Sequence, residues 1–266
     1  MDILKRNNII RFGRGAVPML FSHGYGCDQN MWRYITSAFE EDYEVYLFDH
    51  VGSGRSQENA YDPEKYSSLE GYASDVVEIC ECLGLKDTIF VGHSVSAMIG
   101  VLASIKRPSL FSQLIMVGPS AKYINQNGYF GGFNESDIME LVETLESNYL
   151  GWASHIAPVI TGRPDKPEFS DELNNSFCSM NPDIAKQFAK VTFLGDNRKD
   201  LPKVTIPSLV IQSNPDTIAP VEVGKYIQSE IPNCEYIELD SPGHCPHLTE
   251  PQQTIAAIKS YLNLSK

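Results

Sequence analysis

Residues 88–96 read Thr-Ile-Phe-Val-Gly-His-Ser-Val-Ser, and this stretch decides the fold that we expect for the chain. The apolar run Thr88–Val91 predicts a buried strand, and residues 97–103 are apolar on nearly every face of a helix. A serine between such a strand and such a helix is typical of a strained turn that points its hydroxyl above the edge of a sheet. The sequence therefore predicts a nucleophile elbow centred on Ser94.

The last residue of the stretch departs from the usual pattern. Ser96 stands where this turn ordinarily has glycine, and it adds a second hydroxyl near the first. Ser96 is therefore a second candidate nucleophile beside Ser94.

The elements around the turn favour an α/β fold. Apolar positions between Leu69 and Leu83 recur at helical spacing, with a Ser67-x-x-Glu70 capping box in front and Gly84 as a stop. Short apolar runs predict buried strands at residues 19–22, 45–48, 89–91, 114–117, 209–211 and 236–239. Strands that alternate with helices predict a mostly parallel, doubly wound sheet.

This alternation stops between about Tyr123 and Asp200. Ile138, Leu141, Val142 and Leu145 form one helical stripe, and further helical pieces follow at residues 169–177 and 183–193. We interpret residues 123–196 as a helical cap inserted into an α/β core made of residues 1–122 and 197–266.

Aromatic residues of the cap are expected to roof a hydrophobic pocket. The predicted ligand contacts are Tyr25, Phe130, Phe133, Trp152 and Phe193. The alternative is that Phe133, Trp152, Phe188 and Phe193 form only the small core of the cap itself.

Composition excludes several function classes. The chain has 266 residues, 42% of them hydrophobic, and a net charge of −13, which disfavours nucleic-acid and anionic-membrane surfaces. No apolar stretch reaches the length of a signal peptide or a membrane span, so we expect a cytoplasmic protein. The six cysteines lack a framework spacing and are expected to be reduced thiols.

A serine needs a base and an acid that orients the base, and in proteins with this elbow they follow in the order Asp, then His. Asp216 comes directly after the strand predicted at residues 209–211, and His244 follows the last predicted strand in a Gly-His turn. Both loops are expected at the same edge of the sheet. We therefore predict Ser94, Asp216 and His244 as the catalytic residues.

Three other residues compete for these roles. His247 could replace His244 as the base, Asp240 could replace Asp216, and His93 inside the elbow is expected to pack rather than react. His244, Cys245 and His247 also suggest metal binding, but no second cluster completes a coordination sphere. We expect neither a metal nor a cofactor.

Two backbone N–H groups are expected to stabilise an oxyanion. One belongs to Val95, which follows the nucleophile at the start of a helix. The other belongs to Tyr25, in the loop that follows the strand at residues 19–22.

The motifs at residues 23–29, 48–56, 91–95 and 243–247 together resemble one branch of the α/β-hydrolases, over essentially the whole chain. Within it, the chain most resembles the RsbQ-type regulators of the bacterial sigma-B stress response, and more distantly the strigolactone and karrikin receptors of plants. The resemblance implies the same triad, the same oxyanion donors and a four-helix cap. Tyr25, where phenylalanine is expected, and Ser96 depart from that branch.

The resemblance implies two functions. The first is a serine hydrolase that acts on a small hydrophobic ester-like or lactone-like ligand and serves as a positive regulator in a sigma-B type stress response. The second is a ligand sensor whose hydrolysis is slow and whose cap contacts a partner protein. In the regulator case the implied partner is a PAS-domain phosphatase.

Overall fold

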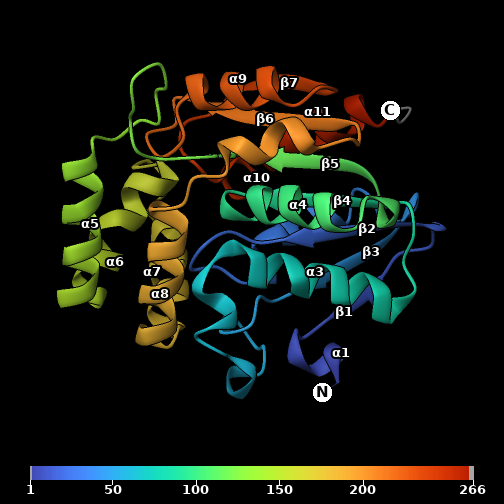
Figure 1. Ribbon diagram of the computed structural model, residues 1–266, viewed down its shortest axis with the longest axis horizontal. Coiled ribbons are helices and arrows are strands. Elements are labelled where there is room, and N and C mark those ends of the chain that lie inside the picture. The colour runs from blue at the N-terminus through green and yellow to red at the C-terminus, as the bar shows by residue number, and fades with distance from the viewer. Residues whose placement is uncertain (1, 264–266) are drawn as a thin grey trace.

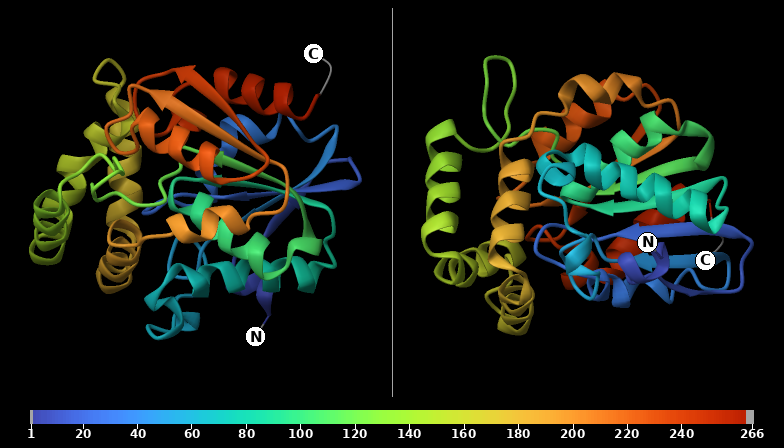
Figure 2. Two further views of the ribbon diagram at one scale, coloured as in Figure 1. Left: turned by 45° about the horizontal axis from the view of Figure 1, so that its top comes forward. Right: turned by 60° about the horizontal axis from the view of Figure 1, so that its bottom comes forward.

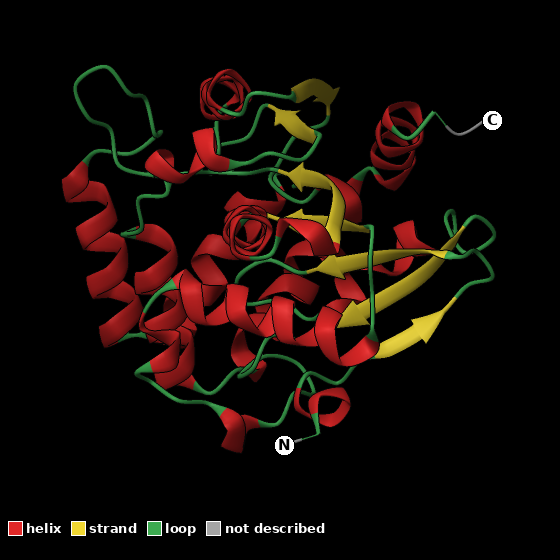
Figure 3. Cartoon of the chain, turned by 45° about the vertical axis from the view of Figure 1, so that its right-hand side comes forward, coloured by secondary structure: helices red, strands yellow, loops and turns green. Residues whose placement is uncertain are grey.

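The computed structural model describes residues 2–263, and within them seven strands form one twisted sheet with helices on both sides (Figure 3). The strand order is β1-β3-β2-β4-β5-β6-β7; β1 is antiparallel to β3, and the other neighbouring pairs are parallel. The strands are β1 Ile10–Phe12, β2 Val17–Ser22, β3 Tyr43–Phe48, β4 Thr88–His93, β5 Phe111–Val117, β6 Ser208–Asn214 and β7 Cys234–Asp240.

Helices cover both faces of the sheet and one of its ends. The helices are α1 Ile3–Arg6, α2 Arg33–Thr36, α3 Leu69–Leu83, α4 Val95–Lys106, α5 Glu135–Ser147, α6 Tyr149–Thr161, α7 Pro167–Ser179, α8 Pro182–Phe193, α9 Val221–Glu230, α10 Pro246–Thr249 and α11 Pro251–Tyr261. Short 3-10 turns are η1 Gln29–Trp32, η2 Glu58–Ala60, η3 Lys65–Ser67, η4 Pro108–Leu110 and η5 Arg198–Lys203. The four helices α5–α8, which we call the cap helices, lie beyond the carboxyl ends of the strands (Figures 1 and 2).

The sheet has an apolar layer on each face because successive side chains of a strand point to opposite sides. On the face covered by α3 and α4, the layer includes Leu20, Phe90 and Leu114. The opposite face contributes Met19, Val91 and Ile115, which pack with side chains from η1, α2 and α11. Burial on both faces explains why the central strands read as continuous apolar runs.

The expected α/β-hydrolase-like fold, with a mostly parallel sheet, is confirmed. Each of the six predicted strands lies within β2–β7, and the predicted helix before the elbow is α3, which ends at Gly84. The short strand β1 was not predicted, because its three residues are largely exposed and form no apolar run. The predicted N-cap residue of α3, Ser67, is wrong by one position. The N-cap is Ser68, because Ser67 belongs to the 3-10 turn η3.

No helix among the described residues is long and apolar enough to cross a membrane.

A buried ion cluster fixes the N-terminal segment against α3. The Asp75 carboxylate, 1% exposed, lies 2.6 Å from Lys65 Nζ and 3.3 Å from Arg6 Nη2, and it accepts a hydrogen bond of 2.8 Å from the Tyr66 hydroxyl. Burial raises the pKa of Asp75, while Arg6 and Lys65 counteract that shift. The cations therefore compensate for the hydration that the carboxylate loses.

We expect Asp75→Ala to lower the free energy of unfolding by about 3 kcal/mol, because it takes the buried partner away from the Arg6 guanidinium. Denaturant unfolding followed by circular dichroism measures the change. Glu78→Ala is the matched control: Glu78 pairs with the same Arg6, but its side chain is 40% exposed, so the loss should stay below about 1 kcal/mol. Equal losses in the two variants would contradict the role assigned to burial.

Candidate active site

The turn between β4 and α4 has the strained backbone that the sequence predicts. Ser94 lies between the last residue of β4 and the first residue of α4, with φ 55° and ψ −122°. Its N–H donates to the Val117 carbonyl at 2.8 Å, which fixes the turn to the neighbouring strand. A Cβ on Gly92 would lie 2.5 Å from the Ser96 carbonyl oxygen, so the close approach across the turn requires glycine there. The strain thus holds the Ser94 side chain at the carboxyl edge of the sheet.

Three side chains form a connected chain at this edge. His244 Nε2 lies 2.8 Å from Ser94 Oγ, and His244 Nδ1 lies 2.7 Å from Asp216 Oδ2. All three residues are buried, with exposed fractions of 7% for Ser94, 6% for Asp216 and 3% for His244. This is the geometry in which an imidazole can accept a serine proton while a carboxylate holds the ring.

The carboxylate of Asp216 is itself held by backbone groups. Its Oδ1 accepts hydrogen bonds from the N–H groups of Ile218 at 2.8 Å and Ala219 at 3.1 Å. Its other oxygen, Oδ2, is thereby directed at the His244 ring, and Gln212 Nε2 lies 3.4 Å from it. The loop after β6 therefore orients the acid without using a second charge.

The His244 loop is fixed on both sides. The His244 N–H donates to the Ile160 carbonyl of α6 at 2.7 Å, and the Gly243 N–H donates to the Pro215 carbonyl at 2.8 Å. His93 Nε2 lies 2.9 Å from the His244 carbonyl oxygen, so this ring nitrogen carries a proton and donates it. His93 thus holds the His244 loop by a hydrogen bond, a structural role like the packing role that was predicted for it.

The residues that compete for these roles are not part of the hydrogen-bonded chain of Ser94, His244 and Asp216. Ser96 is fully buried, donates to the His23 carbonyl and lies 2.8 Å from His50 Nε2. Asp240 is exposed at the end of β7. His247 packs its ring against Trp32, with centroids 4.5 Å apart, and neither ring nitrogen has a hydrogen-bond partner among residues 2–263. The structure thus brings Ser94, rather than Ser96, to the imidazole of His244.

Two free backbone donors flank Ser94. The N–H groups of Tyr25, in the loop after β2, and of Val95, the first residue of α4, have no backbone acceptor in the described part of the chain. The loop before Tyr25 is fixed, because the His50 N–H donates to His23 Nε2 at 3.1 Å. An oxyanion formed beside Ser94 could accept hydrogen bonds from both donors.

A narrow cavity opens above Ser94, with about 30 Å³ accessible to the centre of a water molecule. This is room for about two waters. Besides Ser94 and His244, it is lined by Tyr25, Cys27, His93, Tyr123, Ile160, Leu173, Phe177, Thr192, Phe193, Ile218 and Cys245. The cap helices and the loops at the sheet edge therefore enclose the cavity together.

The predicted pocket residues occupy three different places. Tyr25 and Phe193 line the cavity. Trp152 is buried one layer behind, with its ring 6.0 Å from that of Tyr25, and the half-buried Phe133 packs on Tyr123. Phe130 is 49% exposed and does not reach the cavity.

Sequence reasoning missed Tyr123 and Phe177, which both line the cavity. Burial raises the pKa of Tyr123 to about 12, an effect that the nearby Ser94 hydroxyl counteracts. Its hydroxyl is therefore a protonated donor beside the candidate nucleophile. The sequence signal for Tyr123 was its position in the loop that follows β5, six residues after Val117.

Two buried cysteines also line the cavity, and all six cysteines of the chain are free thiols in the described residues. Burial raises the pKa of the Cys27 thiol well above its usual value, and it raises that of Cys245 as well. Both thiols are protonated at neutral pH.

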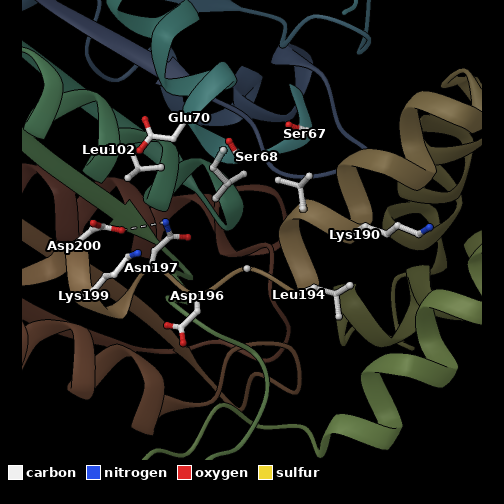
Figure 4. Close-up of a pocket in the computed structure, with 13 residues that line it drawn as sticks. Ser67, Ser68, Glu70, Leu102, Lys190, Leu194, Asp196, Asn197, Lys199 and Asp200 are labelled. Carbon is white, nitrogen blue, oxygen red and sulfur yellow. Dashed lines mark hydrogen bonds between the residues drawn. The ribbon is translucent and has the colours of Figure 1, made fainter. Parts of the chain in front are cut away.

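A wider depression elsewhere on the surface offers no comparable chemistry. It lies between the start of α3 and the segment after α8, with about 450 Å³ accessible to water (Figure 4). Two of its charged side chains are already paired: Lys190 with Glu146, and Asp200 with Lys203 at 2.7 Å. Asn197 Nδ2 lies 3.5 Å from the Asp200 carboxylate, as the dashed line shows. Ser94, Asp216 and His244 do not line this depression.

No group of three or more His, Cys, Asp or Glu residues in the described part of the chain is arranged to hold a metal ion.

Comparisons with known proteins agree with the fold. A family model described as alpha/beta hydrolase fold matches residues 17–190. The chain is 37% identical over 258 residues to the Karrikin insensitive 2 receptor CA of Petunia hybrida, across 97% of this chain and 96% of that protein. It is 36% identical over 262 residues to the Strigolactone esterase D14 of Arabidopsis thaliana, across 98% of each. Among solved structures, a hydrolase from Oleispira antarctica is similar with a TM-score of 0.96 and 40% identity, across 99% of this chain and 97% of that one.

Acid should destabilise the fold through its buried imidazoles. Burial lowers the pKa of His247 to about 3, whereas an unfolded histidine titrates near 6.5. Between these values the unfolded chain binds more protons, so the free energy of unfolding falls as the pH falls from about 6.5 towards 3. Each such histidine contributes about 1.4 kcal/mol per pH unit in this range.

His247→Phe keeps an aromatic ring against Trp32 and removes the titrating group. From pH 7 to pH 5, we expect the free energy of unfolding to fall by about 2 kcal/mol less in the variant than in the parent. Urea unfolding at both pH values measures the change. His155→Gln, on the exposed face of α6, is the control, and its free energy of unfolding should change between pH 7 and pH 5 by as much as that of the parent. An unchanged pH dependence in His247→Phe would show that this buried imidazole does not control acid stability.

Proposed function

The chain belongs to the α/β hydrolase family, and from this premise we propose that it is a serine hydrolase of small hydrophobic esters or lactones. The observation that carries the proposal is the hydrogen-bonded chain from Ser94 Oγ through His244 to Asp216, at 2.8 and 2.7 Å. The esterase name of the Arabidopsis relative supports the same reaction class.

In the proposed reaction, Ser94 Oγ attacks the carbonyl carbon while His244 Nε2 takes the hydroxyl proton. Asp216 holds the imidazole by its Nδ1–H and stabilises the imidazolium. The N–H groups of Tyr25 and Val95 stabilise the tetrahedral oxyanion. His244 then protonates the leaving alkoxide, and water, activated by the same imidazole, releases the acid from the acyl-serine.

The lining of the cavity supports a small apolar acyl group. Leu173, Phe177, Phe193 and Ile218 surround the space above Ser94, and no Asp, Glu, Lys or Arg is among the described residues that line it. The cavity holds about 30 Å³, so an acetyl-sized group is the size that suits it before the cap helices move.

We expect Ser94→Ala to lower the rate of p-nitrophenyl acetate hydrolysis by about 1,000-fold or more, because the base then has no nucleophile to activate. Release of p-nitrophenolate measures the rate, and circular dichroism checks the fold. Ser96→Ala is the matched control at the neighbouring hydroxyl and should lose less than about 10-fold. If Ser96→Ala lost more of the hydrolysis rate than Ser94→Ala, the nucleophile would be Ser96 and this proposal would be refuted.

We propose ligand sensing as a second candidate function, because a relative 37% identical along nearly the whole chain is named a receptor. Hydrolysis would then be slow, and the cap helices would present the ligand-bound state to a partner. A PAS-domain phosphatase as the partner belongs to this candidate as a prediction from the sequence. A role as a positive regulator in a sigma-B type stress response was predicted for the hydrolase, and a cytoplasmic location for either candidate; both stay predictions.

A pull-down with a purified PAS-domain phosphatase separates the two candidates. For a sensor, the phosphatase is retained by the parent protein and lost with Ser94→Ala. Retention by neither form, together with rapid ester turnover, would favour a metabolic hydrolase.

A further inference from the structure

We propose that the Tyr25 hydroxyl is a positioning group that couples closure of the cap helices to the alignment of the oxyanion hole. This inference rests on the proposed hydrolase function and adds a regulatory element to the same site. It concerns residues 23–27, which we call the oxyanion loop.

The cap helices hold the middle of the oxyanion loop. The Tyr25 hydroxyl donates to the Ala185 carbonyl of α8 at 3.1 Å, and the Ser176 hydroxyl of α7 donates to the Gly26 carbonyl at 2.7 Å. The Phe177 ring covers Gly26 so closely that a Cβ there would lie 1.8 Å from it. Two hydrogen bonds and one close ring contact therefore join residues 25 and 26 to the cap.

The core holds the start of the same loop. The Ser96 hydroxyl donates to the His23 carbonyl, and the His50 N–H donates to His23 Nε2. Tyr25 therefore lies at the boundary, with His23 attached to the sheet and its own side chain attached to α8. The position of the Tyr25 N–H depends on both attachments.

The Tyr25 ring is surrounded by rings from three cap helices. Its centroid lies 6.0 Å from Trp152 of α6, 5.8 Å from Phe177 of α7, and 5.6 and 6.0 Å from Phe188 and Phe193 of α8. Burial raises the pKa of Tyr25 well above its usual value, so the hydroxyl keeps the proton that it donates. The cap helices therefore hold the side chain by ring contacts from α6, α7 and α8 and by the hydrogen bond to Ala185 of α8.

A cavity of about 30 Å³ cannot admit an ester unless its walls move, and Tyr25 and Phe193 are two of those walls. Movement of α8 away from the sheet either breaks the hydrogen bond to Ala185 or moves Tyr25 with the helix. In the first case the Tyr25 N–H loses one of the two attachments that fix its position, and in the second it is carried away from Ser94, so it is fully aligned for an oxyanion only when the cap is closed. Tyr25 thus makes full catalytic alignment conditional on closure.

Tyr25→Phe tests this coupling with little damage to the fold. The variant removes only the hydroxyl, and the Ala185 carbonyl keeps the N–H bond of its own helix. We expect kcat for p-nitrophenyl acetate to fall by about 2- to 10-fold, the effect of one net hydrogen bond, while KM stays constant or falls. Steady-state kinetics on the full chain gives both constants.

Tyr129→Phe is the matched control. Tyr129 is also a buried tyrosine whose hydroxyl donates to a backbone carbonyl, that of Lys122 at 2.7 Å, but it does not line the cavity. We expect neither kcat nor KM to change in this variant. Ser176→Ala removes the second link and should lower kcat in the same direction as Tyr25→Phe.

Two results would overturn the inference. One is a Tyr25→Phe variant with unchanged kcat, and the other is an equal fall of kcat in Tyr129→Phe, which would indicate a general effect of lost stability. Both are distinct from a failure of the proposed function, which would appear as parent activity that survives Ser94→Ala.

Discussion

The strained backbone of Ser94 is the constraint on which the rest of the site depends. A non-glycine residue at φ 55° and ψ −122° costs about 1–3 kcal/mol, and the surrounding packing has to supply that energy. The hydrogen bond from the Ser94 N–H to Val117 and the buried strand and helix on either side supply it. The strained turn holds the Ser94 side chain beyond the sheet edge, where the loops that follow β2, β6 and β7 can reach it.

The cap helices contribute to the site as well as covering it. The His244 N–H donates a hydrogen bond to a backbone carbonyl of α6, and the oxyanion loop is in contact with α7 and α8. The acid loop, by contrast, is held by its own backbone around Asp216. The base and the oxyanion donor therefore depend on the cap, while the nucleophile and the acid depend on the sheet.

The sequence allowed prediction of those parts whose signals are local. Apolar runs marked the six longer strands, and the elbow, Asp216 and His244 followed from their positions after strands. The pocket lining was predicted less well, because it depends on how α5–α8 are placed in space. Phe130 is as aromatic as Phe177, yet one lies in an exposed loop and the other over Gly26. Helical periodicity shows which side of a helix is buried, but not which neighbour buries it.

The two cysteines of the cavity bear on how the site discriminates between its own nucleophiles. Sulfur is intrinsically the stronger nucleophile, but an electrophile that enters the cavity meets Cys27 and Cys245 as protonated thiols. Ser94 differs from them because an imidazole nitrogen lies 2.8 Å from its oxygen, ready to take the proton. The reactive group in this cavity is therefore the one that can lose its proton, and the two cysteine sulfurs do not react.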